Sequence, residues 1–388
     1  MSSQAPRSKL VRLLVLSVVA VFLGIVTGLV TRLFIVLLEA IQHAIWTTVP
    51  SKLHIPATHY LYTIIACLIG GALVGVAAHF LGNYPKNIKD DLAEFQKNKK
   101  FDYKHIPQTF GNSLLSLGFG ASLGPEAALT TIIGGLSTWM TDRLKLTLGH
   151  PKQSIKPSFA NKLHFYVPVV LAFAVAYWVF SRTASGSSYF DLQTIAYTFD
   201  ITDIFKSLLP IVVGLGLGIV FLKVSQLCKQ VFARVKSDYL KGLIGGLVLG
   251  LLAAWWPLVL FSGHEGIQSI MTDYATISAA MLVISALAKS IAANTLLSTG
   301  WKGGQFFPVM FAGGAIGLSL THMLPAIPAM VGLVAAMTAM LSIVVGKPVV
   351  AGVLVALFFP PSLYPAILVA TVLPMLVMRL DRYKKLVT

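Results

Sequence analysis

Two glycine-rich segments hold the residues whose types and spacing could bind an ion. The first covers residues 118–129 and contains Gly-Pro-Glu at 124–126, and the second covers residues 300–308 and contains Gly-Gln-Phe-Phe-Pro at 304–308. Proline suits the first turn of a helix, where its missing N–H is no loss. Glycine lets a backbone approach a ligand closely. Both segments therefore predict helix N-termini, whose free N–H groups favour negative charge.

Glu126 is the most unusual residue of the first segment. The chain has four glutamates, and Glu126 alone is flanked on both sides by long uncharged stretches. An ionisable side chain within a membrane segment is costly and by default functional. We therefore expect Glu126 to lie at a helix N-terminus and to change its protonation during function. The alternative is a glutamate at the membrane interface that only caps a helix.

The second segment favours an anion as its ligand. Successive backbone N–H groups ahead of a helix can coordinate an anion, and no acidic residue occurs between Asp273 and Asp381 to repel one. The alternative is a connecting loop followed by an ordinary helix start.

The composition places these segments in a membrane. Of 388 residues, 56% are hydrophobic and 11% are charged, with a mean hydropathy of +0.79, whereas soluble chains carry roughly 25% charged residues. A bilayer-spanning helix needs about 20 mostly apolar residues. We therefore predict an all-α integral membrane protein, with residues 1–388 as a single transmembrane domain and no soluble domain. The predicted helices cover residues 10–45, 59–82, 106–120, 126–141, 163–181, 205–223, 240–261, 276–298, 308–323, 328–346, 348–359 and 365–379.

Several predicted helices are too short to cross a bilayer alone, since about 12–16 residues reach only about 18–24 Å. Such half-membrane helices build the binding sites of many transporters, in corresponding positions of two repeats. A weak repeat supports this arrangement, because nine residues separate Pro125 from Gly134 and also Pro308 from Gly317. The approximate repeat halves are 1–181 and 205–379. Chance similarity between glycine-rich membrane helices is the alternative.

The basic residues predict which side of the membrane each loop faces. The net charge is +16, and the lysines and arginines gather near both termini and in residues 86–104 and 223–241. Short loops rich in such residues stay cytoplasmic. We expect both termini and both stretches inside a plasma membrane of the bacterial inner-membrane type, crossed many times. Nucleic-acid binding is not expected, because the basic residues flank spans and no aromatic residues are interleaved with them.

With these motifs the chain resembles the CLC family of chloride channels and proton-coupled chloride transporters. Residues 304–308 match the family's GxFxP signature. Residues 123–126 resemble its GREGP segment with proline where arginine is usual, as in a divergent bacterial branch that carries Gly-Pro-Glu. The resemblance implies CLC-like inverted repeats, a homodimer with one pathway per subunit, and transport of chloride or another small anion. It implies no cofactor, metal or enzymatic reaction.

The resemblance also implies roles for individual residues. Glu126 falls on the gating glutamate, and the backbone around Gly304, Gln305 and Phe306 falls on central anion ligands. Tyr364 falls on a tyrosine whose hydroxyl reaches the anion, although a tyrosine of the interfacial belt is an equally open reading. The family's serine ligand has no direct counterpart in Gly82-Asn83-Tyr84-Pro85, so either Asn83 or Tyr84 could replace it.

The chain departs from the family pattern after Glu126. Residues 142–162 are polar and basic, and no acid occurs between Asp142 and Asp191. The first repeat is therefore expected to be shortened, and the family's inner proton glutamate has no counterpart. We expect anion transport gated by a glutamate. The alternatives are a proton-coupled anion antiporter, a non-conducting membrane scaffold, and an intramembrane enzyme that uses Glu126 as a base.

Two further charged positions have competing interpretations. Lys289 interrupts an otherwise uncharged stretch, where it could attract anions or serve a structural contact. His264-Glu265 lacks the second histidine of a zinc motif and is interpreted as a loop cap.

Overall fold

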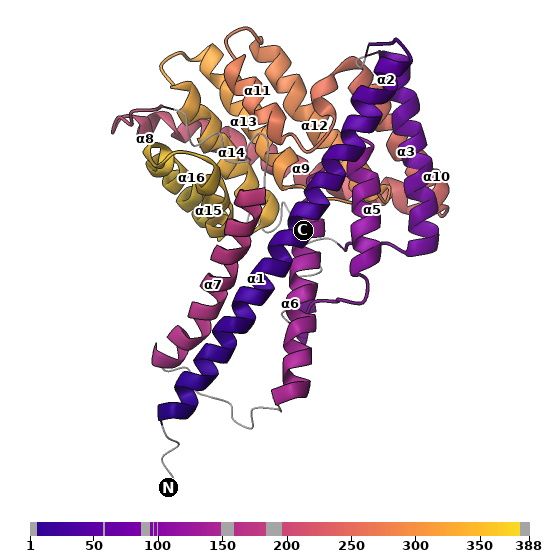
Figure 1. The fold of residues 1–388 in the computed structure, drawn as a ribbon. Coiled ribbons are helices and arrows are strands. Elements are labelled where there is room, and N and C mark those ends of the chain that lie inside the picture. Colours follow the sequence, from indigo (N-terminus) through magenta and orange to yellow (C-terminus); the bar gives the residue numbers. More distant parts are fainter. Residues whose placement is uncertain are drawn as a thin grey trace. The chain divides into compact units, whose positions relative to one another are not determined.

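The computed structural model describes residues 6–56, 59–86, 94–95, 97–98, 100–148, 159–183 and 196–380 (Figure 1). The regular secondary structure in these ranges is helical, which confirms the predicted all-α class. The chain falls into two compact units, which we describe separately. The first comprises residues 1–40, 86–110 and 129–186, and the second comprises residues 41–85, 111–128 and 187–388.

The first unit holds most of three long helices. These are α1 (Pro6–His43), α6 (Glu126–Leu148) and α7 (Phe159–Thr183). Glycines let α1 pack closely on α7, because a Cβ added to Gly24 would lie 2.6 Å from the carbonyl oxygen of Ala172. Small residues at such contacts are typical of helices that pack within membranes.

The second unit holds the remaining helices and both glycine-rich segments, with α5 (Ile106–Gly118) and α6 running across the boundary between the units. Its elements are a π-helical turn (Ala44–Thr48), α2 (Val49–Lys52), α3 (Tyr60–Leu81), α8 (Asp203–Lys206), α9 (Leu208–Ala233), α10 (Asp238–Trp255), the 3-10 turn Pro257–Val259, α11 (His264–Thr272), α12 (Ala279–Ser298), α13 (Phe306–Met323), α14 (Ala329–Val345), α15 (Pro348–Phe358), the 3-10 turn Pro361–Leu363 and α16 (Tyr364–Val377).

Six helical segments in the described residues are long and apolar enough to cross a bilayer. Others are apolar but shorter, including α14 and α15. This mixture agrees with the predicted combination of spanning and half-membrane helices. The six segments are Leu14–Lys52, Tyr60–Leu81, Asp203–Ala233, Asp238–Trp255, Ala279–Ser298 and Phe306–Met323.

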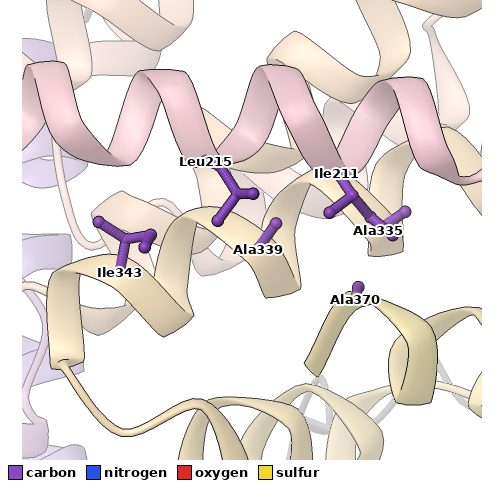
Figure 2. Packing of buried hydrophobic residues seen from close by; sticks show 6 residues of the cluster. All are labelled: Ile211, Leu215, Ala335, Ala339, Ile343 and Ala370. Carbon is purple, nitrogen blue, oxygen red and sulfur yellow. The ribbon is translucent and has the colours of Figure 1, made fainter. Parts of the chain in front are cut away.

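Helix α14 forms the centre of the second unit. Every side chain from Val331 to Val344 is buried, as expected of a helix that is apolar on all sides. On one flank it packs against α9, and a further alanine comes from α16 (Figure 2). Alanine and glycine allow this close approach, because a Cβ added to Gly214 would lie 2.4 Å from the carbonyl oxygen of Ala336. The six labelled residues are Ile211, Leu215, Ala335, Ala339, Ile343 and Ala370.

Helices α3 and α10 pack through facing glycines. A Cβ added to Gly71 would lie 2.4 Å from the carbonyl oxygen of Gly242, and one added to Gly246 would lie 2.3 Å from that of Cys67. The two helices run antiparallel, because Gly75 in the C-terminal half of α3 lies beside Tyr239 at the start of α10.

Several predicted boundaries are wrong, with the largest differences in α6, α9 and α10. Helix α6 continues to Leu148, beyond its predicted end at residue 141. The basic stretch 223–241 is not a loop throughout, because α9 continues to Ala233. The helix predicted over 240–261 ends at Trp255, since Pro257 cannot supply the N–H that would continue it. Residues 264–272 then form α11, which the sequence patterns did not reveal. Residues 1–5 and 381–388, the ends for which a cytoplasmic side is expected, lie outside the described residues.

Candidate functional site

The two glycine-rich segments meet within the second unit. The backbone N–H of Gly124 donates to the carbonyl of Gly304 at 2.8 Å, and the N–H of Gly304 donates back to the carbonyl of Gly124 at 2.7 Å. This reciprocal pair places the start of α6 beside the start of α13. The N-termini of two helices thus converge on one place.

The Glu126 carboxylate occupies this place. Glu126 is the first residue of α6, and its Oε1 accepts a hydrogen bond of 2.6 Å from the backbone N–H of Phe306, 180 residues away. Charged acceptors make the stronger hydrogen bonds, so this contact at the start of α13 favours the deprotonated form of the carboxyl group.

Glycine is required on both sides of the carboxylate. A Cβ added to Gly304 would lie 2.2 Å from Glu126 Oε1, and one added to Gly124 would lie 1.9 Å from Oε2. The conformation of Glu126 therefore depends on two positions that have no side chain. Gln305 takes the N-cap position of α13, and its side chain makes no cap hydrogen bond.

Two side chains from the first residues of the second unit hydrogen-bond the segment ahead of Glu126. Trp46 Nε1 donates to the carbonyl of Gly118 at 3.0 Å, and Gln42 Nε2 donates to the carbonyl of Leu117 at 3.0 Å. Gly120 has a φ of +80°, a conformation that favours glycine. Its carbonyl accepts from the N–H of Phe261 at 3.0 Å.

The buried side chain of Lys289 holds residues 258–261, the segment that contacts Gly120. Its side chain is fully buried, and its ammonium donates to the carbonyls of the four residues 258–261 at 3.1, 3.1, 2.9 and 2.8 Å. It also lies 5.4 Å from the ring centroid of Phe311 on α13. Of the two interpretations left open, the structural contact is the one observed, because the ammonium is engaged with backbone acceptors. These carbonyls belong to the segment whose Phe261 N–H holds Gly120.

The structure brings Asn83 near the second segment and places Tyr364 at the start of α16. The Oδ1 of the exposed Asn83 would lie 4.0 Å from a Cβ added to Gly300. Tyr364 begins α16 and is 42% exposed. No hydrogen bond among the described contacts joins it to Glu126 or Phe306, so its predicted role stays a prediction.

An aromatic group beside the site was not predicted. The ring of Phe307, the residue after Phe306, lies 5.5 Å from the ring of His264 and 5.6 Å from that of Phe358. His264 begins α11 and Phe358 ends α15. In the sequence, Gly263 before α11 and Pro360 after α15 indicate that the chain turns at these points. They do not indicate which side chains come into contact.

Curated proteins that this chain resembles in sequence are ion-transport proteins by name. The chain is 25% identical over 355 residues to the "Putative ion-transport protein YfeO" of Escherichia coli (strain 55989 / EAEC), which covers 84% of this chain and 82% of that protein. The protein of the same name from Shigella flexneri matches with the same identity and coverage.

Solved structures share the fold. A slow cyanobacterial Cl−/H+ antiporter superposes with a TM-score of 0.74 at 16% identity, covering 96% of this chain and 97% of that one. A CLC-type fluoride/proton antiporter gives a TM-score of 0.70 at 17% identity, covering 93% and 95%.

The family described as "Voltage gated chloride channel" matches residues 156–379, more than half of the chain. The matched range contains the segment 300–308, while the Glu126 segment lies ahead of it. The resemblance drawn from both motifs is thereby confirmed, and the chain belongs to the voltage-gated chloride channel family.

Proposed function

We propose that this protein moves chloride or another small inorganic anion across the cell membrane, through a pathway gated by Glu126. The observation that carries the proposal is the 2.6 Å hydrogen bond from the Phe306 N–H to the Glu126 carboxylate. That contact is the one a permeating anion would make with the start of α13. The carboxylate thus occupies a site suited to an anion, and the two compete for it.

The gating step follows from this competition. Rotation of the Glu126 side chain away from Phe306 frees the backbone N–H groups for an anion, which they stabilise in place of water. Protonation removes the negative charge and with it the charge-assisted part of the hydrogen bond. Flux is therefore expected to rise as pH falls, because the neutral side chain leaves the amides more readily.

The substitution Glu126→Gln tests the gate in liposomes that hold the purified protein. The amide has the shape of the carboxylate without its charge, so anion efflux at neutral pH should rise and its pH dependence should flatten. The matched control is Glu265→Gln, at an exposed glutamate in the first turn of α11, which should behave as the unaltered protein does. Unchanged efflux at every pH in Glu126→Gln would rule out the gate.

Proton-coupled antiport is the second candidate, supported by the antiporters among the structural neighbours. Against coupling, no acid occurs between Asp142 and Asp191 to replace the family's inner proton glutamate. The same liposomes separate the two, because an antiporter acidifies or alkalinises the lumen when only an anion gradient is imposed. We expect no such pH change. Absence of efflux for chloride, nitrate and fluoride alike would favour a non-conducting scaffold.

The remaining features of the proposal come from the family and, for the side that the termini face, from the basic residues near them. We propose a homodimer with one pathway in each subunit, a plasma-membrane location with both termini cytoplasmic, and no catalysed reaction. The central ligands are the amides around Gly304, Gln305 and Phe306, with Asn83 nearer one end of the pathway and Tyr364 as a further candidate.

A further inference from the structure

Asn112 on α5 hydrogen-bonds the backbone on both sides of Asn83. Asn112 is 4% exposed, and its Nδ2 donates to the carbonyl of Gly82 at 3.0 Å and to that of Tyr84 at 2.8 Å. These carbonyls belong to the residues directly before and after Asn83. A side-chain amide has two N–H donors, so both are used on the backbone that flanks this one residue.

The direction of the Asn83 side chain depends on that support. The side chain is exposed and makes no hydrogen bond within the described part of the chain. Gly82 has a φ of +79°, a conformation that favours glycine, and the N–H of Tyr84 donates to the carbonyl of Gly82 at 3.0 Å. The chain therefore turns sharply at Asn83, and the turn is held by Asn112.

The same face of α5 also holds the second glycine-rich segment. Ser116 lies four residues after Asn112 and thus on the same helix face, and its Oγ accepts a hydrogen bond of 2.7 Å from the N–H of Lys302. One helix face therefore binds both segments. They approach each other where Asn83 Oδ1 would lie 4.0 Å from a Cβ added to Gly300.

A corresponding arrangement supports the other half of the site. Lys289 lies on α12, the helix before α13, and donates to the carbonyls of residues 258–261, which follow α10. Asn112 lies on α5, the helix before α6, and donates to carbonyls that follow α3. In each case a buried donor fixes the segment that follows an earlier helix. The repetition indicates that the contact of Asn112 belongs to the way in which both site helices are supported.

The orientation of Asn112 is costly to keep. Its Oδ1 is buried and has no hydrogen-bond partner, and an unsatisfied buried acceptor destabilises a fold. A leucine would fill a similar volume without that cost. The amide at this position therefore favours a role that needs the two hydrogen bonds of Nδ2.

We propose that Asn112 is a positioning residue for anion selectivity. It keeps the Asn83 amide at the edge of the second glycine-rich segment, where Asn83 Nδ2 donates to an anion that has lost part of its water. A fixed donor favours chloride over nitrate, because chloride is the stronger hydrogen-bond acceptor. Without that donor the cost of dehydration decides, and nitrate loses its water more easily. The inference rests on the proposed function, since selectivity exists only for anions that move.

The ratio of nitrate flux to chloride flux in liposomes tests this role. In Asn112→Leu both hydrogen bonds are lost, so the Asn83 amide is no longer fixed. One neutral hydrogen bond accounts for about 2- to 10-fold in a binding constant, and the ratio should rise by about that factor. Asn83→Ala should raise it to a similar extent. The double variant Asn83→Ala/Asn112→Leu should raise it no further, because Asn112 acts through Asn83.

Asn294→Leu is the matched control, at another buried asparagine of the same unit. Asn294 Nδ2 donates to the carbonyls of Ser290 at 2.9 Å and Phe221 at 3.4 Å, and its Oδ1 is likewise buried without a partner. None of the described contacts joins it to Asn83. The control should lower the thermal midpoint as Asn112→Leu does, and it should leave the flux ratio unchanged.

Hydrogen exchange of residues 82–84 gives a second readout that does not depend on transport. The exchange of these amides should become faster in Asn112→Leu and should keep its rate in Asn294→Leu. Unchanged exchange in Asn112→Leu would overturn the proposal even if the flux ratio moved, because the side chain would then not hold this segment.

The flux outcomes separate this role from the proposed transport. Flux with the same ratio in Asn112→Leu as in the unaltered protein, or an equal rise in Asn294→Leu, would overturn the role of Asn112 and leave the transport intact. No flux of either anion in the unaltered protein would reject the transport, and the selectivity with it. If Asn112→Leu does not fold, Asn112→Ser takes its place, since a serine hydroxyl is too short to reach both carbonyls. An unchanged ratio in Asn83→Ala contradicts the proposal by itself.

Discussion

The contact between Glu126 and Phe306 depends on the absence of a side chain at Gly304. The three atoms nearest to a Cβ added there all belong to Glu126. In Gly304→Ala the new methyl group and the carboxylate cannot both keep their places. We therefore expect the carboxylate to leave the Phe306 amide, so that anion flux rises at neutral pH, as is expected of Glu126→Gln.

A double-mutant cycle measures this dependence. Residues in contact show coupling energies of about 0.5–3 kcal/mol, so Gly304→Ala should increase flux in the unaltered background and have little effect in Glu126→Ala. Gly216→Ala on α9 is the control, because nothing lies within 4 Å of its added Cβ. Equal effects of Gly304→Ala in both backgrounds would show that Gly304 acts on something other than Glu126.

For individual residues, the sequence predicts best the features that depend on backbone conformation or on an unusual residue type. Glycine and proline marked the two helix starts, and the scarcity of acids singled out Glu126. The partners of Lys289 were beyond reach, because they are carbonyls 28–31 residues away. Every residue has a carbonyl, so no residue type signals the contact, and the positive φ at Phe261 could not be foreseen.

Lys289 links three elements that position the site. From α12 it reaches the segment after α10, and its ammonium faces the ring of Phe311 on α13. In Lys289→Met the volume is roughly kept, but the carbonyls of residues 258–261 lose the three N–H donors of the ammonium. Each buried unsatisfied group costs about 1–3 kcal/mol before relaxation, so we expect the protein to be less stable by about 2–4 kcal/mol and its thermal midpoint in detergent to fall.

The control for this loss is Lys223→Met on α9, whose side chain is exposed. It removes the same charge without uncovering any acceptor, and its midpoint should stay near that of the unaltered protein. Equal midpoints for Lys289→Met and Lys223→Met would mean that water replaces the ammonium at no cost, and that Lys289 does not hold the segment.

Elements were predictable where apolar runs are long. The cores of α3, α10, α12, α13 and α14 fall within the predicted ranges. Helix α11 was missed because it has only nine residues and carries His264 and Glu265, so no apolar run marks it. The sequence does not indicate the extension of α9 to Ala233, because its lysines suggest a loop, although helices readily carry lysine beyond the membrane.

The orientation of the second unit in the membrane follows from how its helices run. Trp301 Nε1 donates to the carbonyl of Gly242 at 3.2 Å, so the end of α12 lies by the start of α10. At the other end of α12, His322 Nε2 hydrogen-bonds the carbonyl of Tyr274 at 2.7 Å. The 20 residues of α12 span about 30 Å, so the α9–α10 connection and the α13–α14 connection lie at opposite ends.

Cysteine labelling in intact cells tests this orientation. In a background without the two native thiols, Cys67→Ala and Cys228→Ala, the exposed positions Lys236→Cys and Ala326→Cys report on the two connections. Because basic stretches stay cytoplasmic, a membrane-impermeant maleimide should label Ala326→Cys from outside and Lys236→Cys only after the membrane is opened. The reverse pattern would place the α9–α10 connection on the external side. Labelling of both from outside would contradict a membrane-spanning α12.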